Sequence, residues 1–365
     1  MATDSTCNSS FPRKRESTAR DWTPACAGVT EKTQLSATPA SFPRKRESTR
    51  NSSFPRTRES SVRTSTLFLA APVAAIALLW PIVAAGQAKS PTAKPADIPF
   101  YGSKLGQLEI WDDGLSEMCY YDAESTVYGE IRKYTRVHLT NREFFDPIAG
   151  VKTDQTDAPG VVPVFKMNIA EEIPTQNYNY RWLTTLFLNR ESLQPLKAVF
   201  SSQEWCGATY KHARWTDAGA TLRQFSYFEG EAESQHDWPA NVWPFEASFM
   251  LAREFVAGGA IPKIDGMLPA LRSNRETPAE VERDVAFIAM GRDRVTTPAG
   301  EFEVEKVQLR LGKKWRYTFS VESRAPFRVI RYDFGNESGV LRGCERRAYW
   351  DRAKPSAFYK VGQAP

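Results

Sequence analysis

The sequence predicts a mainly β protein, either a curled antiparallel sheet or an open β-barrel, connected as a meander and carrying one or two helices. Strand-length runs rich in aromatic and β-branched residues recur along most of the chain after residue 105, and short turns separate them. A parallel doubly wound sheet would need a helix between most strands, and the sequence lacks that alternation.

The expected strands fall into two groups of short runs. In the first half they cover residues 106–111, 118–141 with one break, 161–169, 180–188, 195–206 and 220–228. In the C-terminal third they cover 284–295, 301–311, 315–322, 327–334 and 339–350. The short connections between successive runs favour a meander.

One segment between the two groups has the spacing of a helix. In residues 243–259, Phe249 follows Phe245 by four residues and Met250 is adjacent to Phe249, with Pro244 suited to a first turn and Gly258 to a stop. We therefore expect a helix that lays an apolar stripe on the sheet.

The run 301–311 changes phase part of the way along. Apolar residues occupy even positions at Phe302 and Val304 but odd positions from Val307 onward. A one-residue phase change moves side chains to the other face of a strand. The pattern predicts a β-bulge near Glu305 and Lys306, which would also bend the strand.

Residues 1–63 contain three near copies of one phrase, as in "SFPRKREST" from Ser41. They hold 12 basic and 6 acidic residues, whereas the rest of the chain holds 36 and 37, so the net charge of +5 comes from this segment. The phrase resembles the translation of a dispersed intergenic DNA repeat. We expect a disordered extension outside the native product, and no nucleic-acid partner.

Residues 64–88 resemble an export signal, with Arg63 ahead of an uncharged, mostly apolar run that ends in small residues. Translation would then start near Val62, and cleavage after Ala88 would leave 277 residues, with cleavage after Ala85 or an uncleaved anchor as alternatives. The expected organisation is a signal peptide at 64–88, a Pro-rich linker at 89–99, a β-rich exported domain at 100–352 and a tail at 353–365. Cleavage would leave no stable membrane span, and the predicted location is the periplasm or cell envelope.

Three phrases of the β region resemble a family of uncharacterised exported bacterial proteins that carry YGEIR, QEWCG and SYFE. Here they are "VYGEIRKY" from Val127, "SSQEWCGATY" from Ser201 and "FSYFEGE" from Phe225. Some relatives are labelled as Maf-type septum formation inhibitors, a label at odds with export, since true Maf proteins are cytosolic nucleotide pyrophosphatases. The segment from Val295 to Leu341 also resembles the C-terminal half of a second periplasmic β-sheet family. Neither resemblance implies a catalytic mechanism.

Cys206 is the candidate nucleophile, with Glu204 beside it and His212 as a possible base. The chain has only three histidines and no Gly-x-Ser-x-Gly elbow. A buried structural cysteine on a core strand explains Cys206 more simply than catalysis. We therefore favour a protein that is not an enzyme, with an envelope-acting hydrolase or transferase using Cys206 as the alternative.

Export would carry Cys119, Cys206 and Cys344 through an oxidising compartment, with one thiol left over. The sequence allows at most one disulfide among these three. Either Cys206 pairs with Cys344, or all three cysteines are buried thiols.

A metal site is conceivable at Glu229, Glu231 and His236, where carboxylates alternate along a predicted strand. Glutamates on one strand face more often face water, and no zinc-type Cys or His spacing occurs. We expect neither a metal nor a cofactor.

Aromatic residues make up 12% of the chain, and a curled sheet capped by a helix can enclose an apolar molecule. The same residues could simply form the core. The function we favour is an exported envelope protein that binds a lipid or other apolar ligand. The competing non-enzymatic possibility is a scaffold in envelope assembly that recognises another envelope protein through a sheet edge.

Overall fold

The computed structural model describes residues 102–127, 129–351 and 356. The predicted extension, export signal, linker and C-terminal tail therefore lie almost entirely outside the described residues. The prediction of a mainly β protein, a curled antiparallel sheet or open barrel with one or two helices, is confirmed. The described residues form a large antiparallel sheet that is not closed and one α-helix.

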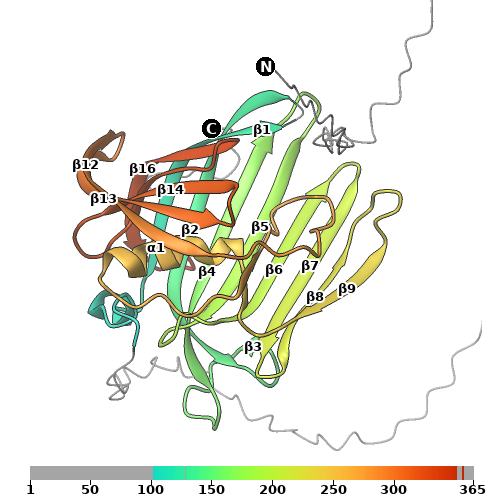
Figure 1. The fold of residues 1–365 in the computed structure, drawn as a ribbon, viewed down its shortest axis with the longest axis horizontal. Helices are drawn as coiled ribbons and strands as arrows, with labels where there is room; N and C mark the ends of the chain where they lie inside the picture. The colour runs from blue at the N-terminus through green and yellow to red at the C-terminus, as the bar shows by residue number, and fades with distance from the viewer. Residues whose placement is uncertain (1–101, 128, 352–355, 357–365) are drawn as a thin grey trace, which may run out of the picture. The chain divides into compact units, whose positions relative to one another are not determined.

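The main sheet has 14 strands, and the chain enters it in the middle (Figure 1). Its order is β12-β13-β14-β15-β16-β1-β2-β4-β5-β6-β7-β8-β9, and β3 pairs with β2. The strands β12 and β9 form the two edges, so the sheet consists of two antiparallel meanders joined by the pairing of β1 with β16.

The bounds of most strands follow the predicted runs, but residues 207–216 and 233–238 also form strands, which was not predicted. The first meander contains β1 (Ser116–Val127), β2 (Glu130–Asp146), β3 (Val151–Lys152), β4 (Val162–Pro174), β5 (Asn179–Asn189), β6 (Pro195–Glu204), β7 (Gly207–Thr216), β8 (Gly219–Phe225) and β9 (Glu233–Trp238). The second contains β12 (Ala286–Thr297), β13 (Gly300–Leu311), β14 (Trp315–Glu322), β15 (Val329–Asp333) and β16 (Glu337–Arg347). A small parallel pair consists of β10 (Val242–Pro244) and β11 (Gly266–Leu268).

The predicted helix is present but shorter than its sequence pattern. A 3-10 turn, η2 (Phe245–Ala247), leads into α1 (Ser248–Val256), and Gly258 follows with a φ of 78°. A left-handed residue after a helix favours glycine, which explains the stop. Residues 248–254 are all buried, so α1 is a core helix that packs against β13, β14 and β15.

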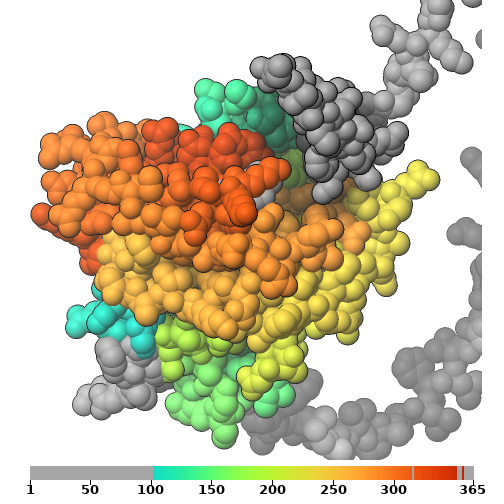
Figure 2. All heavy atoms as spheres, viewed as in Figure 1, coloured from blue at the N-terminus to red at the C-terminus, as the bar shows by residue number. Residues whose placement is uncertain are grey.

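The segment after α1 crosses the inner face of the first meander without forming long strands. We call residues 269–281 the strap. Its carbonyl groups accept hydrogen bonds from inward-facing side chains, including Lys211 Nζ to Leu271 O at 2.7 Å and Gln224 Nε2 to Thr277 O at 2.9 Å. Sheet side chains thus satisfy backbone groups that a strand partner would otherwise satisfy. In the space-filling view this orange segment lies against the yellow residues of β8 and β9 (Figure 2).

Two local predictions were wrong. Residues 106–111 form turns and the 3-10 helix η1 (Glu109–Asp112), where the Trp111 indole donates to Leu105 O at 2.9 Å and its ring packs edge-on against Phe165. The register shift expected near Glu305 and Lys306 lies on the neighbouring strand, between Ala289 and Gly291 of β12. The extra residue therefore bends the edge strand rather than β13.

Candidate functional site

The QEWCG phrase forms the hairpin between β6 and β7. Glu204 pairs with Gly207, which leaves Trp205 and Cys206 as the two residues of the turn. A Cβ on Gly207 would overlap the ring of Tyr227, so the close approach of that ring requires glycine. Hairpin geometry therefore accounts for the glycine of the phrase and for the position of its Trp and Cys in the turn.

Glu204 is the centre of a hydrogen-bond network behind this turn. Its Oε1 accepts from Ser202 Oγ at 2.7 Å and from Trp182 Nε1 at 3.2 Å. Its Oε2 accepts from Tyr227 Oη at 3.1 Å and from Asn274 Nδ2 of the strap at 3.2 Å. Four donors on one carboxylate fix its position, and burial together with the Glu204 charge raises the pKa of Tyr227.

The turn itself presents an aromatic surface. Trp205 is 84% exposed and its ring stacks on Tyr178, with centroids 5.3 Å apart and planes 16° apart. The Tyr178 hydroxyl donates to Cys206 Sγ at 2.8 Å, and Cys206 is exposed. This environment holds the thiol at the surface beside two rings rather than in the core.

The structure places His212 away from Cys206. His212 lies five residues beyond Gly207 on β7, about 17 Å at roughly 3.3 Å per residue. Burial and the charges of Lys197, Arg214 and Arg223 lower the pKa of His212. Of the three candidate catalytic residues, Glu204 and Cys206 share a turn, and His212 belongs to a different surface.

The three candidate metal ligands are also dispersed. Glu229 and Glu231 lie in the turn before β9, so the expected alternation on one strand does not occur. Glu231 forms an ion pair with Arg275, and His236 Nε2 lies 3.4 Å from Glu276 Oε1. The candidate ligands Glu231 and His236 therefore each already have a partner.

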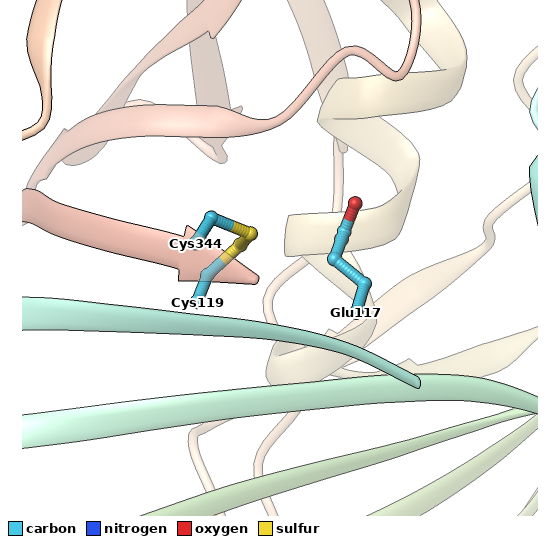
Figure 3. Close-up of side chains that lie close together, drawn as sticks. All are labelled: Glu117, Cys119 and Cys344. Carbon is cyan, nitrogen blue, oxygen red and sulfur yellow. A yellow bond between two sulfur atoms is a disulfide. The ribbon is translucent and has the colours of Figure 1, made fainter. Parts of the chain in front are cut away.

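A different group of potential ligand atoms does gather within 4.8 Å among the described residues, namely those of Glu117, Cys119 and Cys344 (Figure 3). Cys119 and Cys344 form a disulfide, which corrects the alternatives of a Cys206–Cys344 bond or three thiols. The two residues are directly opposite on β1 and β16. Cysteine binds a metal as its thiolate, which neither residue has in a disulfide, and the Glu117 carboxylate accepts from Arg253 of α1 at 2.7 Å, so the group serves structure.

Sequence reasoning missed a buried ring of four charges between the strap and the sheet. Arg136 of β2 pairs with Glu171 of β4 at 2.8 Å and with Glu337 of β16 at 2.5 Å. Arg272 of the strap pairs with the same two carboxylates. The arginines hold the pKa of Glu171 at about 2. No local pattern indicates this ring, because its members are distant in sequence.

No family model matches the chain. No curated protein matches it. Among solved structures, the chain is similar to a β-barrel-like protein of the domain of unknown function DUF1849 from Brucella abortus. The sequence identity is 12%, the TM-score is 0.39, and the match covers 64% of this chain and 98% of that chain.

Proposed function

We propose that the chain is an exported protein of the cell envelope that binds a lipid surface through one end of its sheet. The Cys119–Cys344 disulfide supports export, because disulfides form and persist mainly in compartments outside the cytoplasm. The apolar run at residues 64–88 has the composition of an export signal and supports the same location. None of the helices formed by the described residues is long and apolar enough to cross a bilayer.

The observation that carries the lipid proposal is the exposed Trp205 ring stacked on Tyr178. Tryptophan and tyrosine combine an apolar body with a polar edge, and both are favoured at membrane interfaces. Ile131, which is 67% exposed, lies near Tyr178. The two are linked by neighbouring residues, because Gln176 Nε2, two residues before Tyr178, donates to the carboxylate of Glu130 at 3.0 Å. We call Ile131, Tyr178 and Trp205 the aromatic end.

The aromatic end is held rigidly. Glu204 directly precedes Trp205 in the chain, and its carboxylate is fixed by four hydrogen-bond donors. The Tyr178 ring stacks on one side of the Trp205 ring. A side chain that is already ordered loses less conformational entropy on binding. The same turn with a mobile tryptophan would bind more weakly.

A surface site fits the packing better than an enclosed apolar ligand. The cavity between α1 and the sheet, lined by residues that include His138 and Phe249, is about 10 Å³. That volume suits about one water molecule. The aromatic residues on the inner face pack with one another, as in the contacts of Phe249 with Phe319 and Tyr332.

Sedimentation with phospholipid vesicles tests the proposal. We expect the intact chain to bind vesicles of phosphatidylethanolamine and phosphatidylglycerol, and Trp205→Ala to weaken binding about tenfold, which is the loss for one large apolar contact. Trp350→Ala is the matched control, because Trp350 is 56% exposed but follows β16 at the opposite end of β1. Absence of vesicle binding, or equal loss in both variants, would contradict the proposal.

An envelope scaffold is the second candidate, and β12 is the observation that favours it. This edge strand has 12 residues, and residues 289–294 are exposed. Exposed edges can add a strand from another chain. A photo-crosslinker at Met290, which is 54% exposed, would favour the scaffold if it captured a defined envelope protein that is not captured from the more exposed Ile148, at 88%.

A further inference from the structure

The outer face of β6, β7 and β8 carries four basic or titratable side chains in contiguous positions. Lys197 of β6 lies directly opposite Arg214 of β7, and His212 of β7 lies directly opposite Arg223 of β8. His212 and Arg214 are two residues apart, so all four side chains project from the same face. We call these four residues the basic cluster.

Among the described residues, no ion pair within 4 Å includes Lys197, Arg214 or Arg223, although hydrogen bonds from Thr221 and Gln235 and the charge of Arg223 lower the pKa of Asp237. The hydrogen-bond acceptors of these three basic residues are neutral. Lys197 Nζ donates to Gly150 O at 3.0 Å, Arg214 Nη2 to Pro147 O at 2.6 Å, and Arg223 Nε to Gln235 Oε1 at 3.0 Å. Like charges opposite one another destabilise a sheet.

The electrostatic effect of this clustering is visible in two groups. Burial and the Arg214 charge lower the pKa of Lys197. Burial and the charges of Lys197, Arg214 and Arg223 also lower the pKa of His212. The His212 Nε2 atom is buried and has no hydrogen-bond partner among the described residues. Nearby acids are Asp217 in the β7–β8 turn and Asp237, whose carboxylate accepts from Thr221 and Gln235. An anionic ligand would relieve the remaining repulsion.

Three of the four residues of the basic cluster line a cleft that is large enough for such a ligand. A cleft of about 890 Å³ is bounded by His212, Arg214 and Arg223 and by the turn at Pro147 and Ile148. A second depression of about 520 Å³ shares His212 and Arg223 with it. Small-molecule sites generally span about 300–1,000 Å³.

The second depression adds an aromatic wall. Tyr210 and Phe225 are each 41% exposed, lie directly opposite each other on β7 and β8, and have ring centroids 6.2 Å apart. Both project from the same face as His212 and Arg223, one pair further along the ladder. Exposed rings beside cations suit a ligand that has both a planar group and a negative charge.

We propose that this outer face binds a phosphate ester that carries a planar ring. The phosphate would lie among His212, Arg214 and Arg223, since guanidinium groups match its oxygens, and the ring would rest on Tyr210 and Phe225. The same phosphate chemistry occurs in free phosphate esters and in phospholipid headgroups. This site shares no residue with the aromatic end, so the two proposals can be tested separately.

Calorimetric titration of the intact chain with phenyl phosphate tests the site. We expect one site per chain, tighter binding than for inorganic phosphate, and at least tenfold weaker binding in Arg223→Gln, because charge-assisted hydrogen bonds are lost. Arg292→Gln is the charge-matched control on exposed β12, where binding should stay within twofold of the unsubstituted chain. Tyr210→Ser should weaken phenyl phosphate binding and leave inorganic phosphate binding unchanged.

Phosphatidylglycerol vesicles separate the two sources of the phosphate. Loss of vesicle binding in Arg223→Gln, with Trp205 intact, would place a lipid headgroup phosphate in the basic cluster and overturn the requirement for a planar ring. An effect on phenyl phosphate alone would identify a free ester that carries the ring. Absence of binding at millimolar phenyl phosphate, or equal loss in Arg223→Gln and Arg292→Gln, would overturn the proposal. Equal melting temperatures of the variants confirm that the comparison concerns folded protein.

Discussion

Lys211 lies on the inner face of β7, beneath the strap, where a curled sheet would ordinarily place an apolar residue. Its ammonium group donates to Leu271 O at 2.7 Å and to Thr277 Oγ1 at 2.8 Å, and it lies over the Phe200 ring. Burial lowers the pKa of Lys211 to about 7. The sequence pattern did not predict β7, because a lysine at an inward position interrupts the apolar alternation that predicts a strand.

The pKa of Lys211 makes stability depend on pH. The folded pKa of about 7 is below the unfolded value of 10.5, so the unfolded chain binds the extra proton between these values. The free energy of unfolding should therefore rise by about 2 kcal/mol from pH 7 to pH 9 through this group. Urea denaturation across that range should show the rise in the unsubstituted chain and lose it in Lys211→Met. Identical pH slopes in the two proteins would contradict the assignment.

At the scale of elements, the strap is attached to the sheet by side chains, and the buried charge ring is its firmest attachment. Arg272 reaches Glu171 of β4 and Glu337 of β16, and its Nη2 donates to Tyr134 Oη at 2.7 Å. Each buried arginine in the ring contacts both carboxylates, so the four charges balance. The strap is thereby tied to both meanders.

Breaking the ring should destabilise the fold strongly. Arg272→Met leaves two buried carboxylates with one arginine, and removal of one partner of a buried ion pair costs about 3–5 kcal/mol. Arg181→Met is the matched control, because Arg181 pairs with Glu172 on the surface, where such pairs contribute less than about 1 kcal/mol. Urea denaturation should separate the two variants. Comparable losses in both would show that the ring does not hold the strap.

Elements differ in how far local sequence predicts them. The strand β14 alternates apolar and polar residues, and β5 is a short run rich in aromatic and aliphatic residues, so their patterns predict them directly. The strand β9 was missed because its inward residues, including Ser234 and His236, face Glu276 of the strap instead of an apolar core. The QEWCG turn was recognised as a candidate site, but its contact with Tyr178 depends on β4 and β5 and cannot be inferred locally.

At the scale of the whole molecule, the first and last strands pair at the centre of the sheet. The ladder between β1 and β16 joins two meanders, and the disulfide between Cys119 and Cys344 spans 225 residues across that ladder. Pairing of cysteines this distant in sequence could not be predicted, because it depends on the order of strands. A cross-link that closes a long loop chiefly limits the freedom of the unfolded chain.

Loss of the disulfide should therefore lower global stability. Cys344→Ser should reduce the free energy of unfolding by about 2–5 kcal/mol, whereas Cys206→Ser should change it by less than about 0.5 kcal/mol. Denaturation with and without reductant measures both, and reductant should affect only proteins that retain Cys119 and Cys344. An equal effect of Cys206→Ser would contradict the pairing.

The pairing of the first and last strands also bears on the order in which the cysteines can react. For a chain exported as proposed, with its N-terminal end leading, Cys344 enters the oxidising compartment 225 residues after Cys119. Cys206 appears in that interval, so the first thiol that Cys119 can meet within the described chain belongs to the QEWCG turn. The contact between Cys206 and Tyr178, which needs both the β4–β5 turn and the β6–β7 hairpin, would hold Cys206 away from Cys119 until Cys344 has entered.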